Sequence, residues 1–163
     1  MIILGLDPGL AITGYGVVEI SARAITHKEH GTLKTSPNLQ YRDRLISLNK
    51  QLKAVVKKFA PDCVGIEKLY VHKNVKTATM VGEARGVLML TIARFPILMY
   101  EFTPLQVKQI LTGYGRATKT QVQNMVMRML KLKEPPKPDD AADALAVAIC
   151  VAQTYPPCGK AKP

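Results

Sequence analysis

Four carboxylates in the sequence occupy positions where charged side chains could do chemistry together. Asp7 follows a short apolar run and comes directly before a Pro-Gly turn. Glu67 ends a second apolar run, where a charge costs burial energy unless it is paired or binds a metal. Asp140 and Asp143 are three residues apart, so they project from one face if they lie on a helix. These four residues are therefore candidates for a shared metal site.

Carboxylates gathered in one place repel one another, and each unpaired one would protonate or destabilise the fold. A divalent cation removes this problem, and a set of oxygen ligands alone suits Mg²⁺ or Mn²⁺ rather than Zn²⁺. Two such ions about 4 Å apart can stabilise both the attacking and the leaving oxygen in phosphodiester hydrolysis. The chemistry that these residues suggest is metal-dependent cleavage of a phosphodiester.

Each carboxylate also has a structural explanation that involves no metal. Asp139 and Asp140 could cap a helix, since carboxylates favour helix N-termini. Asp143 could pair with a surface lysine, Asp7 could hold the Pro-Gly turn, and Glu67 could be an exposed strand end. Taken one at a time, the residues other than Asp7 favour these structural explanations, and taken together in a basic protein they favour the metal site and these explanations equally. The residues alone leave both interpretations open.

Hydrophobic periodicity indicates the elements that must position these side chains. Three strands are expected over Ile2–Asp7, Thr13–Ile20 and Ala24–Thr35, with Ser21–Arg23 as a connection, and they predict an antiparallel meander. The later elements are expected in this order: a helix between Leu39 and Phe59 that Pro61 ends, a strand over Asp62–Glu67, a helix over Val75–Arg94, a strand over Ile97–Phe102, and helices near Pro104–Leu111, over Lys119–Leu130 and from about Pro138 to Gln153.

This order predicts an α/β sheet with helices on its faces. If the first and fourth strands are neighbours, the ends that carry Asp7 and Glu67 lie side by side. The last helix then need only cross those ends to gather all four carboxylates.

The composition indicates one domain that meets a polyanion. The chain has 163 residues, which suits a single domain, expected over residues 1–155. Residues 156–163 are basic and rich in proline, and we expect a disordered tail there. The chain carries 23 Lys and Arg against 12 Asp and Glu, a net charge of +11. Such an excess attracts polyanions, of which nucleic acid is the commonest.

Other features narrow the class of protein. No apolar run approaches the roughly 20 residues that span a bilayer, and the first residues lack the basic segment of a signal peptide and are interrupted by Pro8. Cys63, Cys150 and Cys158 are odd in number and irregular in spacing, so we expect free thiols in a reducing cytoplasm. They share no ligand spacing with the three histidines, which argues against a zinc site.

Beyond the carboxylates, the sequence resembles the RuvC family of Holliday-junction resolvases, which are crossover junction endodeoxyribonucleases. The motifs that carry the resemblance are LGLDPGLAITGYGVV at 4–18, VGIEKLYVHKN at 64–74, GEARGVL at 82–88, TPLQVKQILTGYGRATKTQVQ at 103–123 and DDAADALAVAI at 139–149. The resemblance implies the ribonuclease H-like fold, an α/β fold with a five-stranded mixed sheet flanked by helices. It also implies that the family's DPG, IE and DAAD carboxylates, here Asp7, Glu67, Asp140 and Asp143, bind two Mg²⁺ ions, with Mn²⁺ as a substitute.

The resemblance carries expectations about activity and partners as well. Members of the family act as homodimers that make two symmetrical cuts across a four-way DNA junction, in homologous recombination and DNA repair. In bacteria they work beside a junction-binding protein and a branch-migration motor. The same role is expected of this chain, in the cytoplasm and away from membranes.

Further site residues follow from the same motifs. Lys108 and Lys119 match family lysines near the catalytic centre, where they could neutralise the charge that develops on the scissile phosphate. Tyr70 takes the place of an aromatic residue that meets the junction, and its ring could stack on a base, unless it is an ordinary half-buried tyrosine. The remaining expected DNA contacts are all cationic: Lys73, Lys76, Arg85 and Arg116, together with Lys119.

Three other classes of protein compete with this interpretation. An ATPase or sugar kinase of the actin-like fold has a phosphate loop similar to LGLDPGLAITGYG, but it closes two such domains on a nucleotide and needs a much longer chain. A related ribonuclease H-like enzyme processes ribosomal RNA precursors, and the KTQVQ and DDAADALA blocks favour the resolvase over it. A DNA-binding module without catalysis is disfavoured because all four carboxylates are intact.

Overall fold

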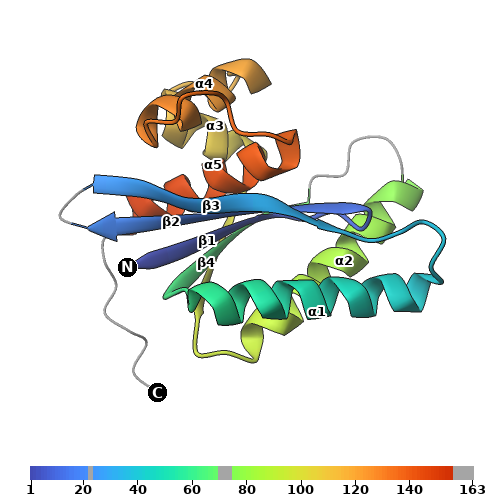
Figure 1. Cartoon of the computed structure of the whole chain (residues 1–163). Coiled ribbons are helices and arrows are strands. Elements are labelled where there is room, and N and C mark those ends of the chain that lie inside the picture. Colours follow the sequence, from blue (N-terminus) through green and yellow to red (C-terminus); the bar gives the residue numbers. More distant parts are fainter. Residues whose placement is uncertain (22–23, 70–74, 156–163) are drawn as a thin grey trace.

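The structure is a computed structural model that describes residues 1–21, 24–69 and 75–155, and for residues 75–77 the backbone alone. Within these residues the chain forms a five-stranded sheet with helices on both faces (Figure 1). Several features that the sequence singled out lie outside the described part: residues 22–23 of the connection after the second strand, Tyr70, Lys73, the side chain of Lys76 and the tail at 156–163.

The sheet is mixed, as the resemblance implied. Its strands are β1 (Ile2–Asp7), β2 (Ile12–Ser21), β3 (Ala24–Lys34), β4 (Cys63–Glu67) and β5 (Leu98–Phe102). Their spatial order is β3-β2-β1-β4-β5. β1, β2 and β3 form the predicted antiparallel meander, whereas β4 pairs parallel with β1 and β5 parallel with β4. The first and fourth strands are therefore neighbours, as the candidate site requires.

Helices cover the two faces unequally. They are α1 (Tyr41–Phe59), α2 (Val75–Ala93), α3 (Pro104–Thr112), α4 (Lys119–Met129) and α5 (Asp139–Thr154). α1 and α2 lie on one face, while α5 lies directly on the other, with α3 and α4 outside it (Figure 1). Each face buries its own apolar cluster, one around Leu145 and Ile149 of α5, the other around Leu48 of α1 and Leu88 of α2.

The predicted ends of the helices and strands lie within two residues of the observed ends. Local sequence signals fix the observed ends. α1 begins at Tyr41 rather than Leu39. It ends at Phe59 and is capped by Ala60, which takes a left-handed conformation with φ of 44° and donates its N–H to the Val56 carbonyl. The following residue, Pro61, cannot continue the helix, as predicted.

α3 and α4 both begin with a capping box. In each, a threonine side chain accepts a hydrogen bond from the backbone of a glutamine three residues later, and the glutamine side chain accepts one from the threonine backbone. The second box pairs Thr118 with Gln121 and so makes Lys119 the first residue of α4.

α5 lies against the backbone of β1 and β2 because glycines line its path. A Cβ atom at Gly5 would stand 2.0 Å from the carbonyl oxygen of Ala144, and one at Gly14 would stand 1.9 Å from that of Asp140. No side chain fits at such a distance, so only glycine permits this approach. Gly14 is also the register partner of Asp7. The start of α5 is thereby held next to the end of β1.

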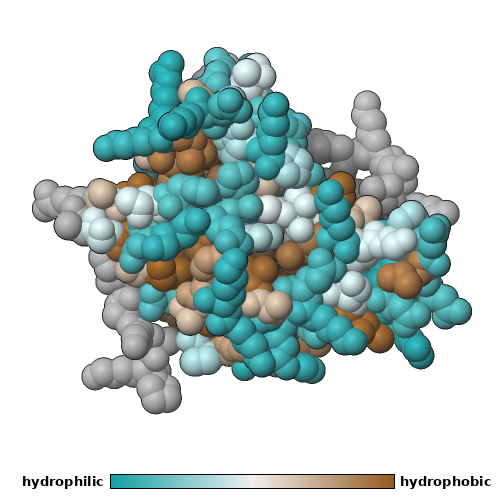
Figure 2. Space-filling view, in the orientation of Figure 1, coloured by the Kyte–Doolittle hydropathy of each residue, from teal (hydrophilic) through white to brown (hydrophobic). Residues whose placement is uncertain are grey.

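The visible surface is largely hydrophilic, including the outer side of α1 along the lower part of the view (Figure 2). Exposed lysines account for much of α1 there: Lys50, Lys53, Lys57 and Lys58. Within the described ranges, none of the helices has both the length and the apolar composition to cross a bilayer.

Candidate active site

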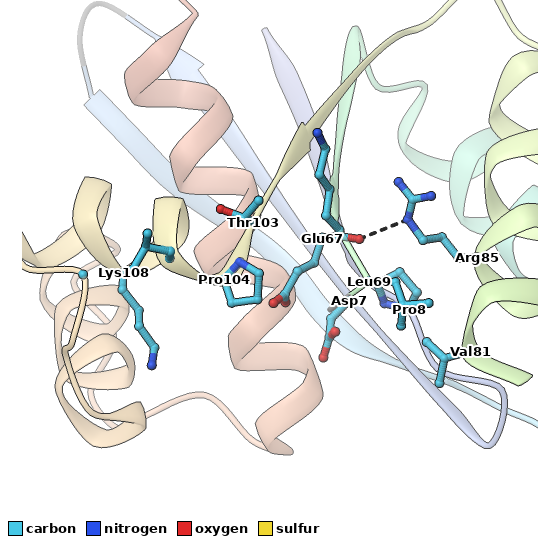
Figure 3. Close-up of a pocket in the computed structure, with 12 residues that line it drawn as sticks. Asp7, Pro8, Glu67, Leu69, Val81, Arg85, Thr103, Pro104 and Lys108 are labelled. Atoms are coloured by element: carbon cyan, nitrogen blue, oxygen red, sulfur yellow. Dashed lines mark hydrogen bonds between the residues drawn. The ribbon is translucent and has the colours of Figure 1, made fainter. Parts of the chain in front are cut away.

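Two of the four carboxylates meet at the ends of neighbouring strands. β1 and β4 run parallel, and their last paired residues are Leu6 and Ile66. Asp7 and Glu67 come directly after this pair as the last residue of each strand, and their side chains point into the same space (Figure 3). This is the juxtaposition that the sequence predicted from the two apolar runs.

α5 supplies the other two carboxylates. Asp140 lies in its first turn and Asp143 three residues later, and both side chains are partly buried. The contact between Gly14 and the Asp140 backbone places this turn beside Asp7. The structure thus brings all four predicted carboxylates to one end of the sheet.

The four side chains form one electrostatic cluster. Burial, together with the negative charges of the other three carboxylates, raises the pKa of Asp7 to about 8, against a lowering by Lys119. Burial and then the charge of Asp143 raise the pKa of Glu67 to about 7. The pKa of Asp143 is also raised by burial, although its hydrogen bond with Lys119 opposes the change. The cluster therefore carries more negative charge than its surroundings stabilise.

This imbalance predicts that metal-free protein loses stability as pH rises. When folding raises the pKa of an acid, there is a pH window between its unfolded and its folded pKa. Within that window the acid is protonated in the folded protein but ionised in the unfolded protein, so the free energy of unfolding falls as pH rises. For Asp7 the window runs from 3.8 to about 8. We expect Asp7→Asn to be as stable as the wild type near pH 4 and about 1–3 kcal/mol more stable at pH 8.

Urea unfolding in EDTA at several pH values measures this difference. Asp43→Asn, which makes the same change at an exposed ion pair with Arg42 on α1, is the control and should show no such trend. A constant difference between Asp7→Asn and the wild type from pH 4 to pH 8 would contradict the raised pKa of Asp7.

The chemistry of these residues suits a divalent metal, although their side chains do not form a complete coordination site. Among the described residues, no three side chains of His, Cys, Asp or Glu are grouped closely enough to hold a metal ion as they stand. Carboxylates whose pKa values are raised by burial and by one another gain most from a cation, because it favours their charged forms. An oxygen-only set suits Mg²⁺ or Mn²⁺, and the ion's attraction would draw the side chains together.

Lys119 reaches the cluster from α4. Its Nζ lies 3.1 Å from Oδ2 of Asp143 and 3.2 Å from Oδ2 of Asp139. Burial alone would lower the pKa of Lys119, but the hydrogen bonds and charges of the two aspartates outweigh it and raise the pKa. Lys119 therefore stays charged beside the site. The alternative that Asp143 pairs with a lysine is thus realised, by a lysine that belongs to the cluster.

The helix-cap alternative for the aspartates at 139 and 140 is wrong. The N-cap residue of α5 is Pro138, which makes no side-chain hydrogen bond, and both aspartates lie inside the first turn. Asp139 instead pairs with Lys119 and accepts a hydrogen bond of 3.0 Å from Nε2 of Gln123. It thereby links α4 to α5.

A cleft of about 660 Å³ opens beside the carboxylates. Asp7, Glu67 and Lys108 all line it, and the charge of Lys108 lowers the pKa of Glu67. Its walls also carry apolar side chains: Pro8, Leu69, Val81, Pro104 and Leu105 (Figure 3). Arg116 is exposed in the connection between α3 and α4.

Two contacts at the site were not predicted from the sequence. Arg85, expected to touch DNA, instead donates from Nε to the Glu67 carbonyl at 3.2 Å and pairs with Glu101 on β5. Cys150 on α5 lies close enough for the Glu67 charge to act on it, and burial, followed by that charge, raises the pKa of its thiol to about 12. Neither Cys63 nor Cys150 forms a disulfide bond, as predicted, while Cys158 lies outside the described residues.

Known proteins resemble the whole of this arrangement in sequence. A family model described as crossover junction endodeoxyribonuclease RuvC matches residues 3–151. A crossover junction endodeoxyribonuclease RuvC of Ruminiclostridium cellulolyticum is 51% identical over 150 residues, which cover 92% of this chain and 90% of the relative. That of Desulforamulus reducens is 52% identical over 153 residues, 94% of each chain.

Solved structures agree in fold. The T. thermophilus RuvC in complex with Holliday junction substrate has 34% identity and a TM-score of 0.88, covering 94% of this chain and 93% of that one. A yeast mitochondrial Holliday junction resolvase has 16% identity and a TM-score of 0.59, which shows likeness of fold alone. The predicted ribonuclease H-like fold is confirmed.

Proposed function

Because this chain belongs to the RuvC family of crossover junction endodeoxyribonucleases, we propose that it resolves four-way DNA junctions by hydrolysing phosphodiester bonds. The observation that carries the proposal is the meeting of four carboxylates and Lys119 at one end of the sheet, in a chain with a net charge of +11. The match over nearly the full length disfavours the actin-like kinase and the RNA-processing enzyme considered from the sequence.

The family depends on divalent metal ions, and the carboxylates supply the ligands. Asp7, Glu67, Asp140 and Asp143 would hold two Mg²⁺ ions, for which Mn²⁺ would substitute. Such ions, when bound, generate the attacking hydroxide and stabilise the leaving oxygen. Asp139 would not bind the metal ions, because it forms an ion pair with Lys119.

The two lysines act on the phosphate. Lys108 lines the cleft beside Glu67, and Lys119 is held by its two aspartates before any DNA arrives. A cation already fixed in place needs no reorganisation when charge develops on the scissile phosphate. Both ammonium groups would contact the non-bridging oxygens, with Lys119 the better oriented of the two.

The remaining DNA contacts that we propose surround the cleft. Tyr70 would stack on an unpaired base at the junction, and Lys73, Lys76 and Arg116 would contact phosphates. We set Arg85 apart from these contacts, because its Nε and Nη2 groups pair with the Glu67 carbonyl and with Glu101 inside the protein. We also propose the bacterial cytoplasm as the location, with a junction-binding protein and a branch-migration motor as partners.

Paired cuts require two sites, and we propose a homodimer. α2 offers a suitable face: Leu90 is 56% exposed, and the space around Gly86, one turn earlier, is open. A second copy of the helix could pack closely at Gly86 and bury Leu90.

Leu90→Glu should therefore yield monomers that nick one strand of a cruciform plasmid rather than linearise it. A charge in a buried apolar contact costs several kcal/mol, enough to dissociate a modest interface. Leu39→Glu, at a similarly exposed residue outside α2, is the control. Light scattering gives the mass, and a dimer that survives Leu90→Glu would exclude this face.

The decisive test of the function is cleavage of a synthetic four-way junction in Mg²⁺, beside linear duplex and an RNA hairpin. We expect symmetrical cuts in the junction alone, and loss of cutting in EDTA. Equal cutting of the duplex would indicate a general nuclease, and cutting of the hairpin alone would favour the RNA-processing class.

Junction binding should weaken steeply with salt, while the preference for junction over duplex persists. Each phosphate that a lysine or arginine neutralises releases counterions, so the logarithm of the affinity falls linearly with the logarithm of the salt concentration. The preference depends on the shape of the junction and should not follow that slope. Titrations of both DNAs in Ca²⁺ between about 50 and 200 mM salt measure it. If the two affinities are equal at every salt concentration, the protein does not recognise junctions.

A further inference from the structure

Arg85 connects three elements next to the candidate active site. It lies on α2, its Nε donates a hydrogen bond of 3.2 Å to the carbonyl of Glu67 at the end of β4, and its guanidinium pairs with the carboxylate of Glu101 on β5. Figure 3 shows the first of these contacts as a dashed line at the edge of the cleft. Arg85 thus touches the backbone of a residue whose side chain belongs to the carboxylate cluster.

The Glu67 carbonyl lies where the sheet itself provides no donor. The pairing of β1 with β4 ends at Leu6 and Ile66. The next N–H beyond Glu67, that of Lys68, donates to Phe102 on β5, so by strand alternation the Glu67 carbonyl points towards β1. There the chain has Pro8, which has no N–H. Arg85 supplies the missing donor from its side chain.

The surroundings of Arg85 favour its contact with the Glu67 carbonyl. Its side chain is only 18% exposed, and that of Glu101 is 38% exposed. The ion pair is partly exposed and contributes little to stability by itself, so its main effect is to fix the direction of the guanidinium. These two contacts direct the Nε and Nη2 groups of Arg85 into the protein, towards the ends of β4 and β5.

We propose that Arg85 and Glu101 form a positioning pair that fixes the end of β4 and thereby orients the Glu67 carboxylate towards the metal. The inference rests on the proposed function and extends it to residues that touch neither metal nor DNA. A carboxylate that follows an unanchored backbone can move by about 1 Å, and a displacement of that size can cost about a hundredfold in rate. Glu101 holds the guanidinium so that its Nε faces the carbonyl.

The test compares Arg85→Gln, Glu101→Gln and the double variant. We expect each single change to slow single-turnover cleavage of a four-way junction by about ten- to a hundredfold. The double variant should be no slower than the worse single one, because the two residues act as one unit. Junction affinity in Ca²⁺ should stay within about twofold of wild type, since neither residue touches DNA. Glu101→Gln is the sharper probe, because losing a negative charge cannot weaken DNA binding by electrostatics.

A matched control is Glu19→Gln, which makes the same change in an ion pair with Lys28 on β2 and β3. It should cleave at the wild-type rate. Thermal melting of each variant shows whether it is folded, and Arg85→Lys, which keeps the charge but offers a less directed donor, should cleave at an intermediate rate. If Arg85→Gln fails to fold, Glu101→Gln and Arg85→Lys still decide the matter.

A second measurement needs no DNA. Calorimetric titration with Mn²⁺ should show weaker binding, by about tenfold, in Arg85→Gln and Glu101→Gln but not in Glu19→Gln. If the wild type bound Mn²⁺ yet cut no junction, the proposed function would fail while this titration still tested the pair. The positioning role is overturned if Glu101→Gln cleaves and binds Mn²⁺ like wild type while Arg85→Gln weakens junction binding. That pattern would make Arg85 a phosphate contact.

Discussion

Asp7→Asn should lower the rate of junction cleavage by about a thousandfold or more and leave junction binding nearly unchanged, a loss of roughly 4 kcal/mol in the transition state. Asparagine keeps the shape of the side chain but removes a charge that the metal ions need. Glu67→Gln, Asp140→Asn and Asp143→Asn should behave alike, because all four carboxylates belong to one electrostatic cluster. Single-turnover cleavage in Mg²⁺ and equilibrium binding in Ca²⁺ measure the two effects separately.

Stability distinguishes this loss from unfolding. Burial and the neighbouring carboxylates raise the pKa of Asp7 to about 8, so its charge destabilises the metal-free fold at neutral pH. Asp7→Asn should therefore melt at a higher temperature than wild type in EDTA while being inactive. Functional sites commonly trade stability for activity in this way. Asp43→Asn provides the baseline for both measurements, and a carboxylate variant that still cuts at near the wild-type rate would exclude that residue from the site.

The fold was largely predictable because each element has a local signal. Pro61 ends α1, the capping boxes at Thr103 and Thr118 start α3 and α4, and apolar runs define the buried strands. Asp7 and Glu67 stood out because a charge at the end of an apolar run is costly without a partner, and Asp140 and Asp143 because their spacing places both on one face of a helix. Periodicity and cost of burial are properties of short segments, and a single sequence displays them.

Contacts between distant side chains were not predictable in the same way. The sequence analysis places Arg85 among the expected DNA contacts, yet the pairing of β4 with β5 brings Glu101 within its reach. The sequence offers a helix cap as one explanation for Asp139, yet Lys119 and Gln123 of α4 approach it from another element. No spacing in the sequence joins residues that only the sheet and helix packing bring together. The sequence indicates where a charged residue lies in the fold, and the structure identifies the residues with which it pairs.

Gly14→Ala should destabilise the protein by about 3 kcal/mol or more and slow cleavage by about a hundredfold in the molecules that still fold. The new Cβ would lie 1.9 Å from the carbonyl oxygen of Asp140 and 2.4 Å from its carbonyl carbon. Both are backbone atoms, so no side-chain rotation relieves the overlap and α5 must move away from β2. Gly14 pairs with Asp7 in register, so the same movement separates Asp7 from the carboxylates of α5.

Gly82→Ala is the matched control, because it adds the same methyl group where the nearest atom outside α2 is Cδ2 of Leu69, 3.6 Å away. That is ordinary contact, and alanine is favoured over glycine within a helix by about 0.8–1 kcal/mol, so this variant should be slightly more stable and fully active. Urea unfolding gives both free energies, and single-turnover cleavage in Mg²⁺ gives both rates. The cleavage rate should fall by more than the unfolded fraction of Gly14→Ala explains, because the carboxylates are displaced in the molecules that remain folded. Wild-type stability and cleavage in Gly14→Ala would mean that α5 does not approach the sheet as closely as its contact with Gly14 requires, and that the site is assembled in another way.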